Sequence, residues 1–594
     1  MAAPTILLLV LAGLAVPPRV QAVDFLTFGG KARPWTSDSL VFNALEQVDG
    51  QLGPLEADST VNLLPRVQEL GGSAVTSVSA AAARSNQILR ELTDDDYTTG
   101  WRVYTDPNGA ELSLDLGAVF ILTRIHMLRG VLTSDERSLR GYEIYANDGD
   151  SLNFVGAEPI YSLIAQDRSH GAPELDVRFR PQAVRYLRLR STGERSFQMG
   201  DMEIFGIGVT PFAHYISKVI DLGQPANFGP VQIHADIDSR ARLLFSTKTG
   251  SVPSDSLYYK QTGIPGEFEE VPREQFDRSL DPSYAGVVRV NNRDWSPWSP
   301  PYASVESALG SPDNRRYLQF EFRFLSNGLT DKAQIDSLRF AYTVPAIADS
   351  VVGEIAPASA LMGRNNSFVY HLRSVVLPNR RGFDTVLITT PFRATATSVV
   401  VDGVEIGDFV QEQGENLLKV TFPNNRITQT GQQITVAFNS LVAVSGTEFR
   451  GEVGDSQSDA FPQRIIGGDA DPQVESNTLV VGGLIEDQLF TGIQLSGSGV
   501  ITPNGDRIND ALQLDYILLK ATSPVQVKVS AHDLSGALVR NIYAARDLSG
   551  PNSVPWDGRN EGGQLVPPGL YLLRLSVQTD AGETTQFHTV AVAY

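Results

Sequence analysis

The stretch ELSLDLG at residues 111–117 alternates apolar and polar side chains and ends in a glycine. Because successive side chains of a strand point to opposite faces of a sheet, this pattern predicts a half-buried β-strand. The same alternation returns in RYLRLR at 185–190 and VQVKV at 525–529. The chain also holds 52 Gly and 34 Pro, which mark frequent turns rather than helix interiors. The sequence therefore predicts an all-β protein.

Two neighbouring stretches of the chain repeat the same motifs. VIDLG at 219–223 is similar to LDLG at 114–117, and RYLQF at 316–320 is similar to RYLRL at 185–189. In each stretch, which is about 130 residues long, the motif that ends in Leu-Gly comes before the Arg-Tyr-Leu motif. Internal similarity of this kind predicts two related β-sandwiches in tandem.

The length of 594 residues exceeds what one hydrophobic core supports, because domains cluster near ~100 to 150 residues. Changes in composition and turn clusters divide the chain into seven segments. We expect a signal peptide (1–22), an N-terminal leader region (23–76), a first sandwich (77–208), a second sandwich (211–344), a third β domain (345–451), a polar Gly- and Asp-rich linker (452–483) and an immunoglobulin-like sandwich (484–594).

The N-terminus has the pattern of an export signal. An apolar run at 6–16 precedes two prolines and the small-residue ending VQA at 20–22, so the mature protein is expected to begin near Val23. An apolar N-terminal strand is the alternative, but the run lacks alternation. No other stretch approaches the ~20 apolar residues of a membrane span, so no transmembrane segment is expected.

Composition narrows the location and the partners of the chain. The formal charge of −20 argues against nucleic acid as a partner, because phosphate backbones attract clustered Lys and Arg. With no Cys there are no disulfides, no thiolate metal sites, no cysteine nucleophile and no lipobox. We therefore expect a bacterial protein that is secreted or displayed on the cell surface.

Five segments between residues 77 and 208 resemble, in order and spacing, the discoidin or coagulation factor type C domain. They are LTDDDYTTGW at 92–101, LDLG at 114–117, YEIY at 142–145, RYLR at 185–188 and MEIFG at 202–206. The resemblance implies a galactose-binding-like jelly roll with ligand loops at one end, and a carbohydrate or another extracellular ligand as partner. With it, the expected fold class becomes all-β, with tandem jelly rolls followed by further β domains and a C-terminal immunoglobulin-like sandwich.

The same resemblance implies a structural calcium ion, whose ligands carry over onto Asp94, Asp96, Thr99 and Glu203. The family usually has Gly where this chain has Asp95, so the turn is expected to differ. From the residues alone, three consecutive carboxylates suit Ca²⁺, which takes ~6 to 8 oxygen ligands. A solvated acidic turn is the alternative.

Four further residues are placed by the same fold near the ligand loops. These candidate ligand-binding residues are Tyr104, Arg129, Arg195 and Phe197. The sequence does not show whether they converge.

The C-terminal segment carries a second resemblance. TPNGDRIND at 502–510 is similar to the start of C-terminal modules on exported proteins of gliding bacteria, while WDGRN at 556–560 and VPPGLY at 566–571 resemble the immunoglobulin-like domain of the flagellar hook-capping protein. The first resemblance implies attachment or sorting, with the secretion machinery as a partner. The residues 504, 506 and 510 have the even oxygen spacing of a cation loop, and an Asx-rich turn is the alternative.

The cluster WSPWSPPY at 295–302 also has two interpretations. Exposed Trp and Tyr stack on the apolar face of sugar rings, whereas Trp between prolines packs equally well on the edge of a sandwich.

Motifs of catalysis are absent from the sequence. The seven His include no His-Glu-x-x-His spacing, and no Gly-x-Ser-x-Gly elbow or phosphate loop occurs. The sequence therefore favours a non-enzymatic exported protein that binds glycan or a surface protein and uses its last domain for attachment. A purely structural or adhesive scaffold is the alternative, and an accessory part of a polysaccharide-degrading enzyme is a weaker one.

Overall fold

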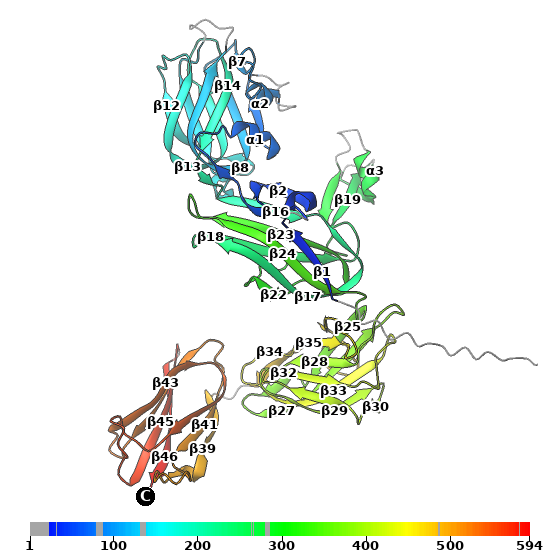
Figure 1. The fold of residues 1–594 in the computed structure, drawn as a ribbon, viewed down its shortest axis with the longest axis vertical. Helices are drawn as coiled ribbons and strands as arrows, with labels where there is room; N and C mark the ends of the chain where they lie inside the picture. The colour runs from blue at the N-terminus through cyan, green and yellow to red at the C-terminus, as the bar shows by residue number, and fades with distance from the viewer. Residues whose placement is uncertain are drawn as a thin grey trace, which may run out of the picture. The chain divides into compact units, whose positions relative to one another are not determined.

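The computed structural model describes residues 23–594, except 31–32, 79–86, 131–137, 263, 265, 279–285, 485–487 and 581. The expected signal peptide, residues 1–22, lies outside the described residues. Two compact units divide the chain, Asp24–Tyr342 and Thr343–Tyr594. Each is built almost entirely from β-strands, which confirms the all-β prediction (Figure 1). No helix in the described part of the chain is long and apolar enough to cross a membrane.

The first sandwich has a seven-stranded sheet in the order β12-β9-β13-β8-β14-β7, with β6 paired to β8. Its strands are β6 (Ser73–Thr76), β7 (Trp101–Val103), β8 (Glu111–Arg129), β9 (Tyr142–Asn147), β12 (Ser162–Asp167), β13 (Leu175–Ser191) and β14 (Phe197–Gly206), with the small pair β10 (Phe154–Val155) and β11 (Glu158–Pro159) and the helices α1 (Leu64–Glu69) and α2 (Gln87–Glu91). The predicted strand at 111–117 opens β8, and its three leucines are buried. Register shifts in β8, β13 and β14 let these long strands bend around the core.

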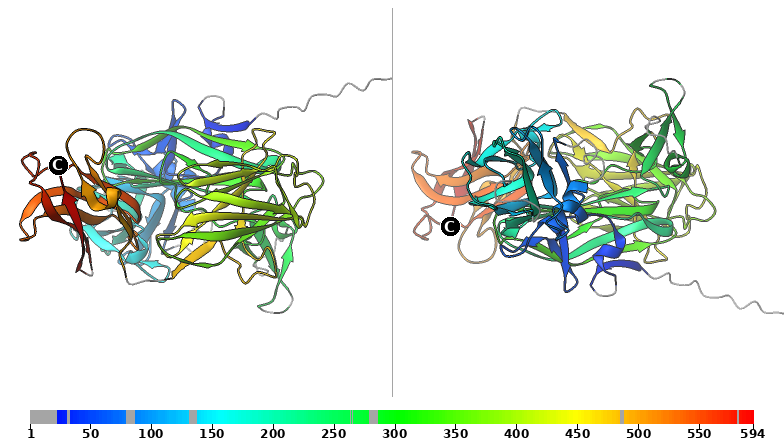
Figure 2. Two further views of the ribbon diagram at one scale, coloured as in Figure 1. Left: turned by 90° about the horizontal axis from the view of Figure 1, so that it is seen from below. Right: turned by 90° about the horizontal axis from the view of Figure 1, so that it is seen from above.

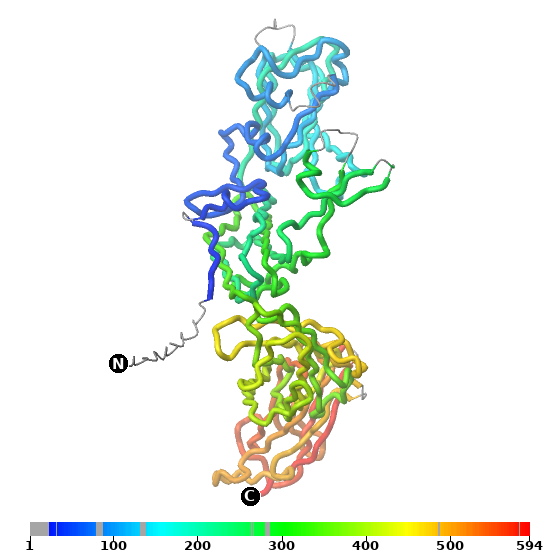
Figure 3. The backbone as a smooth tube through the Cα atoms, turned by 90° about the vertical axis from the view of Figure 1, so that its right-hand side faces the viewer, coloured from blue at the N-terminus to red at the C-terminus, as the bar shows by residue number. Residues whose placement is uncertain are grey.

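The N-terminal leader, expected as a separate region, supplies strands to the second sandwich instead. β1 (Asp24–Gly29) pairs along its whole length with β24 (Ala333–Thr343), and β2 (Ser39–Asn43) pairs with β16 (Phe212–Ser217). In Figure 3 this blue segment runs along the green strands. The aromatic side chains of Phe28 and Trp35 are fully buried there, and their burial drives the pairing.

The chain enters and leaves the first sandwich through adjacent strands. β5 (Glu56–Ala57) pairs antiparallel with β15 (Gly208–Val209). Just outside this pair, the N–H of Thr210 donates to the carbonyl of Leu55 at 2.9 Å. The first sandwich is therefore inserted between strands of the second, an arrangement that a linear division of the sequence does not reveal.

The second sandwich contains a ten-stranded sheet with the path β2-β16-β23-β17-β24-β4-β3. Besides the strands above, it contains β3 (Leu45–Val48), β4 (Gln51–Pro54), β17 (Ile220–Ile237), β18 (Ala241–Gly250), β22 (Glu306–Ala308) and β23 (Arg315–Ser326). A 3-10 turn at Trp35–Asp38 precedes β2. Beside the sandwich, β19 (Ser256–Gln261), β20 (Phe268–Val271) and β21 (Val287–Val290) form a small sheet next to α3 (Arg273–Asp277), which projects from the body of the sandwich (Figure 2).

The repeated sequence motifs form the same local structure in both sandwiches. In the first, the carboxylate of Asp115 accepts hydrogen bonds from the guanidinium of Arg185 at 3.1 and 3.3 Å. In the second, Asp221 accepts from Arg316 at 2.6 and 2.7 Å. Each Asp also accepts from the N–H of the glycine two residues later. The internal similarity therefore extends to a matching Asx turn held by a bidentate arginine.

The third β domain has two facing sheets around one core, which contains buried residues of both, such as Phe368 and Val386. The first sheet has the order β30-β29-β33-β27-β25-β37 and the second β31-β32-β28-β35-β36. The strands are β25 (Ser350–Ala356), β26 (Ser359–Leu361), β27 (Asn365–Val375), β28 (Thr385–Thr389), β29 (Thr395–Val401), β30 (Val404–Glu405), β31 (Val410–Gln413), β32 (Leu417–Thr421), β33 (Gln433–Leu441) and β34 (Thr447–Glu448).

The segment 452–483, expected as a linker, is part of this third domain. It contributes to four strands: β35 (Gly451–Gly454), β36 (Gln463–Arg464), β37 (Ile466–Gly467) and β38 (Val480–Leu484). β35 pairs with β28 and β36, β37 pairs with β25, and β38 pairs with β26 and β34. The segment's polar residues are bound by partners within the domain: Asp455 accepts from half-buried Arg426 at 2.7 Å, and the N–H groups of Ala470 and Asp471 donate to buried Glu354. The linker prediction is wrong because composition alone cannot distinguish a solvated polar segment from one whose polar groups are paired internally.

Limited proteolysis is therefore expected to spare β35, β36, β37 and β38 under native conditions. Backbone held in sheet hydrogen bonds is cleaved only after local unfolding. Mass spectrometry of the first fragments checks this expectation, and an early cut within any of these four strands would contradict their pairing.

The C-terminal sandwich has one sheet of three strands and one of five. The first is β39 (Phe490–Leu495), β41 (Leu512–Leu518) and β44 (Gly550–Trp556); the second is β40 (Val500–Ile501), β46 (Gly582–Val592), β45 (Gly569–Thr579), β42 (Val525–His532) and β43 (Leu538–Asp547). Between the sheets, buried Trp556 packs edge-on against Tyr571, with ring centroids 5.7 Å apart.

Candidate functional site

The acidic loop at 94–99 lies between α2 and β7 of the first sandwich. Thr99 Oγ1 donates to the carboxylate of Asp94 at 3.0 and 3.1 Å, and the N–H of Asp96 donates to the same carboxylate at 3.0 Å. Three of the four predicted metal ligands, Asp94, Asp96 and Thr99, are therefore in one turn. Asp95 has a φ of 56°, so it adopts the left-handed conformation in the place where the discoidin family usually has Gly.

Two tight contacts fix this loop against β14. Gln198, which is 2% exposed, donates from Nε2 to the carbonyls of Thr98 and Thr99 at 3.0 and 3.4 Å. Gly100 has a φ of 105°, and a Cβ there would lie 2.3 Å from the carbonyl oxygen of Met199. Only glycine fits this close approach, so the position of the loop relative to β14 is set by the backbone.

Glu203, the fourth predicted ligand, faces a different partner. It lies opposite His126 in the β14–β8 register, and its Oε2 is 2.7 Å from Nδ1 of that imidazole. Of the four predicted ligands, the structure therefore groups three and leaves Glu203 in a pair with histidine.

Asp201 is the residue of β14 that faces the acidic loop. It is 5% exposed, and its Oδ1 has no hydrogen-bond partner among the described residues. Burial, together with the carboxylates of Asp94 and Asp95, raises the pKa of Asp201 to about 6, although a hydrogen bond from the N–H of Asp95 lowers it in part. A buried carboxylate that has one oxygen without a partner and lies beside other carboxylates is costly unless a proton or a cation compensates its charge.

Sequence reasoning missed Asp201 because β14 carries two acidic residues two positions apart, Asp201 and Glu203. The discoidin resemblance placed the ligand on Glu203. No group of three or more His, Asp or Glu side chains placed to hold a metal occurs in the part of the chain that the structure describes. The carboxylates of Asp94, Asp96 and Asp201 are therefore not gathered around one point in this structure. A Ca²⁺ ion, which takes oxygen ligands, would have to draw them and the hydroxyl of Thr99 together.

The candidate ligand residues at the loop end have different environments. The last residue of β7, Val103, pairs with the first residue of β14, Phe197. The last residue of β8, Arg129, lies opposite Met199 near the same end of β14. The segments that follow β7, precede β14 and follow β8 therefore lie at one end of the sheet. At that end Tyr104 is 62% exposed, Arg195 is exposed and Arg129 is half-buried. Tyr104, Arg129 and Arg195 are therefore brought to one end of the sandwich.

Phe197 is not a ligand residue, and the prediction is corrected. It is 1% exposed and packs edge-on against Trp101, with ring centroids 4.8 Å apart. Its apolar ring belongs to the core that supports the loop end.

The Trp cluster of the second sandwich packs against the protein. Trp295 is 3% exposed and donates from Nε1 to the carbonyl of Val252 at 3.0 Å. The ammonium of Lys248 lies over the rings of Trp295 and Trp298 at 5.3 and 4.7 Å. These contacts favour the packing interpretation over sugar stacking.

The loop at 502–510 has the geometry of linked Asx turns. Both carboxylate oxygens of Asp510 accept backbone N–H groups, from Gly505 at 2.8 Å and Arg507 at 2.7 Å. Asp506 accepts from the N–H of Ile508 at 2.7 Å. These backbone hydrogen bonds account for the even spacing of acidic residues without a cation.

A family model described as the FlgD Ig-like domain matches residues 506–581, which confirms the resemblance to the immunoglobulin-like domain of the flagellar hook-capping protein. The resemblance to C-terminal modules of gliding bacteria stays a prediction. No curated protein sequence matches the chain.

Among solved structures, carbohydrate-binding modules are similar to part of the chain. A family 32 module of Clostridium perfringens NanJ in complex with galactose is 14% identical, covering 23% of this chain and 95% of that one, with a TM-score of 0.19. Another C. perfringens module, CpGH89CBM32-5 in complex with GalNAc-β-1,3-galactose, is 12% identical over 23% and 97% with the same score. Chitosan-binding module 1 from Paenibacillus sp. IK-5 is 17% identical over 24% and 98%, also with a TM-score of 0.19.

Proposed function

We propose that this protein is an exported, non-enzymatic protein that binds carbohydrate through the loop end of its first sandwich. The observation that carries the proposal is the grouping of exposed Tyr104 and Arg195 with Arg129 beside a rigidly held acidic loop. Tyr offers a flat apolar face for a sugar ring, and Arg donates to ring hydroxyls. The order of the sequence motifs and the carbohydrate-binding modules named above support the same ligand class.

Calcium is part of this proposal as a structural ion. The orphaned Oδ1 of Asp201 fits an ion at the acidic loop, with Asp94, Asp96 and Thr99 as the other side chains that would hold it. The ion would supply positive charge that ties the loop to β14, next to the strand that leads to Tyr104. Through these four residues, metal binding would hold the ligand loops in one conformation.

Export and attachment complete the proposal. The signal-like residues 1–22 would direct the chain out of a bacterial cell, and the C-terminal sandwich would attach it to the surface or present it to the secretion machinery. The alternative is a structural or adhesive scaffold without ligand binding, and an accessory role in polysaccharide degradation stays the weaker candidate.

A glycan-binding measurement on the whole chain tests the proposal. We expect Tyr104→Ala and Arg195→Ala each to weaken binding of a galactose-terminated glycan by about tenfold or more, which corresponds to about 1.4 kcal/mol. Arg180→Ala is the matched control, because Arg180 is exposed on β13 near the level of Leu122, away from the loop end. Equal losses in all three variants, or binding of no glycan on an array, would favour the scaffold.

A further inference from the structure

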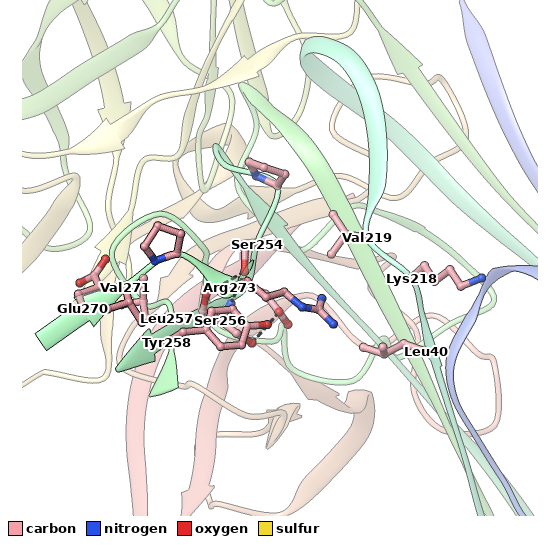
Figure 4. Close-up of a pocket in the computed structure, with 13 residues that line it drawn as sticks. Leu40, Lys218, Val219, Ser254, Ser256, Leu257, Tyr258, Glu270, Val271 and Arg273 are labelled. Carbon is pink, nitrogen blue, oxygen red and sulfur yellow. Dashed lines mark hydrogen bonds between the residues drawn. The ribbon is translucent and has the colours of Figure 1, made fainter. Parts of the chain in front are cut away.

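A cleft of about 470 Å³ opens in the second sandwich, where the small sheet β19–β21 approaches the main body (Figure 4). This volume is within the range of ligand sites, ~300 to 1,000 Å³. Its lining residues come from four segments: Leu40; Lys218 and Val219; Pro253 to Tyr258; and Glu270 to Arg273. The cleft is remote in sequence from the loop end of the first sandwich, and the proposed function does not use it.

The walls of the cleft combine apolar and hydroxyl groups. Leu40, which is 62% exposed, faces the side formed by Leu257 and Tyr258. Ser254 and Ser256 also line the cleft, and their hydroxyls donate to the carbonyl of Ser256 and to the carboxylate of Asp255. Apolar faces together with hydroxyls are the surfaces that contact the C–H face and the hydroxyl groups of a pyranose ring.

One wall of the cleft is held rigid by the Trp cluster. Asp255 Oδ2 accepts from Lys248 Nζ at 2.7 Å, and that lysine is 6% exposed between Trp295 and Trp298. The N–H of Asn291 donates to the carbonyl of Asp255 at 2.8 Å. A wall fixed in this way loses little entropy when a ligand binds.

The cleft is lined by two acidic and two basic side chains, which differ in their partners. Its two acidic residues are already paired: Asp255 with Lys248, and Glu270 with Arg293 at 3.1 Å. Lys218 at the rim donates from Nζ to the carbonyl of Ser37. A carbonyl carries no net charge, so this hydrogen bond does not neutralise the ammonium group.

Arg273 is the second cation of the cleft. In the described part of the chain its one ion pair runs from Nε to exposed Asp277 at 3.4 Å. Figure 4 shows its guanidinium reaching across the gap toward Leu40. The terminal amino groups of this guanidinium are therefore directed at the space a ligand would occupy, where they suit a planar carboxylate.

From these observations, we propose that the cleft binds an acidic saccharide, with Arg273 and Lys218 as the residues that select the negative charge. Because cations outside the lining pair with both carboxylates of the cleft, Arg273 and Lys218 would favour acidic sugars over neutral ones by charge complementarity. The site is independent of the first sandwich and of calcium.

Calorimetric titration of the whole chain with trigalacturonate, at low ionic strength, tests this site. We expect binding with a Kd of about 1 mM or tighter, no binding of the uncharged galactose trimer, and a weaker affinity as salt is added. Arg273→Gln is expected to weaken binding about tenfold, and the double variant with Lys218→Gln to abolish it.

Two controls separate this proposal from its alternatives. Arg289→Gln removes an exposed cation from β21 of the same small sheet, outside the cleft, and should change the affinity less than twofold. Tyr104→Ala should also leave the affinity unchanged, so a failure here is distinct from a failure of the loop-end site. Equal binding of the neutral trimer, equal loss in Arg289→Gln, or no binding of trigalacturonate would each overturn the proposal.

Discussion

Arg426→Ala is expected to lower the free energy of unfolding of the third β domain by about 3 to 5 kcal/mol. Arg426 donates to the carboxylate of Asp455 at 2.7 Å and lies 3.5 Å from that of Asp384, which is fully buried. Its guanidinium also donates to the backbone carbonyls of Arg381 and Gly382. Removal of the cation would leave two carboxylates and two carbonyls without their shared partner.

Protection of the β33 amides against hydrogen exchange measures this loss within the intact chain. Lys419→Ala is the matched control, because its ion pair with Glu412 is exposed on the surface and contributes at most about 1 kcal/mol. Burial opposes ionisation of Asp455, but hydrogen bonds from Arg426 and Ser458 outweigh it and lower the pKa of Asp455. The stabilisation from this pair is therefore present above the ordinary carboxyl range and lost as the pH falls through the lowered pKa. A loss similar to that of Lys419→Ala would contradict the burial of this network.

Asp201→Asn is expected to remove the stabilisation of the first sandwich by calcium. With calcium at a hundredfold excess over Kd, wild type should gain about 2.7 kcal/mol from binding to the folded state, and the variant should gain little. In a chelator the order should invert, because the ionised carboxylate of Asp201 destabilises the folded protein. The pKa of this group is about 6 in the fold, against the ordinary 3.8. This difference corresponds to about 2 to 3 kcal/mol.

The pH dependence of the same variant follows from the sign of that shift. Between about pH 4 and 6, folded Asp201 retains a proton that the unfolded chain has lost, so without calcium stability falls as the pH rises through this window. Asp201→Asn should remove that slope. Exchange protection of the β7 amides measures both effects, and Glu203→Gln is the matched control because its carboxylate pairs with His126. If Glu203→Gln abolishes the stabilisation by calcium and Asp201→Asn does not, Glu203 is the ligand, as the sequence resemblance implies, and Asp201 is not.

The sequence predicted most strands because alternation reports burial directly. The patterns at 111–117, 185–190 and 525–529 all lie in strands of the structure, and the similar motifs around Asp115 and Asp221 form matching turns. The insertion of the first sandwich could not be predicted, because it depends on the pairing of β1 with β24, about 310 residues away. Pairing over such distances depends on which residues Phe28 and its neighbours pack against, and a local sequence pattern does not contain that information.

The polar segments were harder to interpret for a related reason. Residues 452–483 have the composition of a linker, yet Asp455 and the backbone at Ala470 are bound by charged side chains from elsewhere in the domain. On β14 the sequence offered two carboxylates two residues apart, and only the fold shows that Asp201 faces the acidic loop while Glu203 faces His126. Tyr104 and Phe197 were equally plausible aromatic contacts, and burial alone separates them.

Titration of the whole chain with a galactose-terminated glycan, in millimolar calcium and again in chelator, tests the central claim most directly. We predict that wild type binds at least tenfold more weakly in chelator, and that Asp201→Asn in calcium behaves as wild type does in chelator, because the acidic loop supports the loop end that holds Tyr104 and Arg195. Equal affinity in both conditions, or no binding in either, would contradict the account of a calcium-supported carbohydrate site.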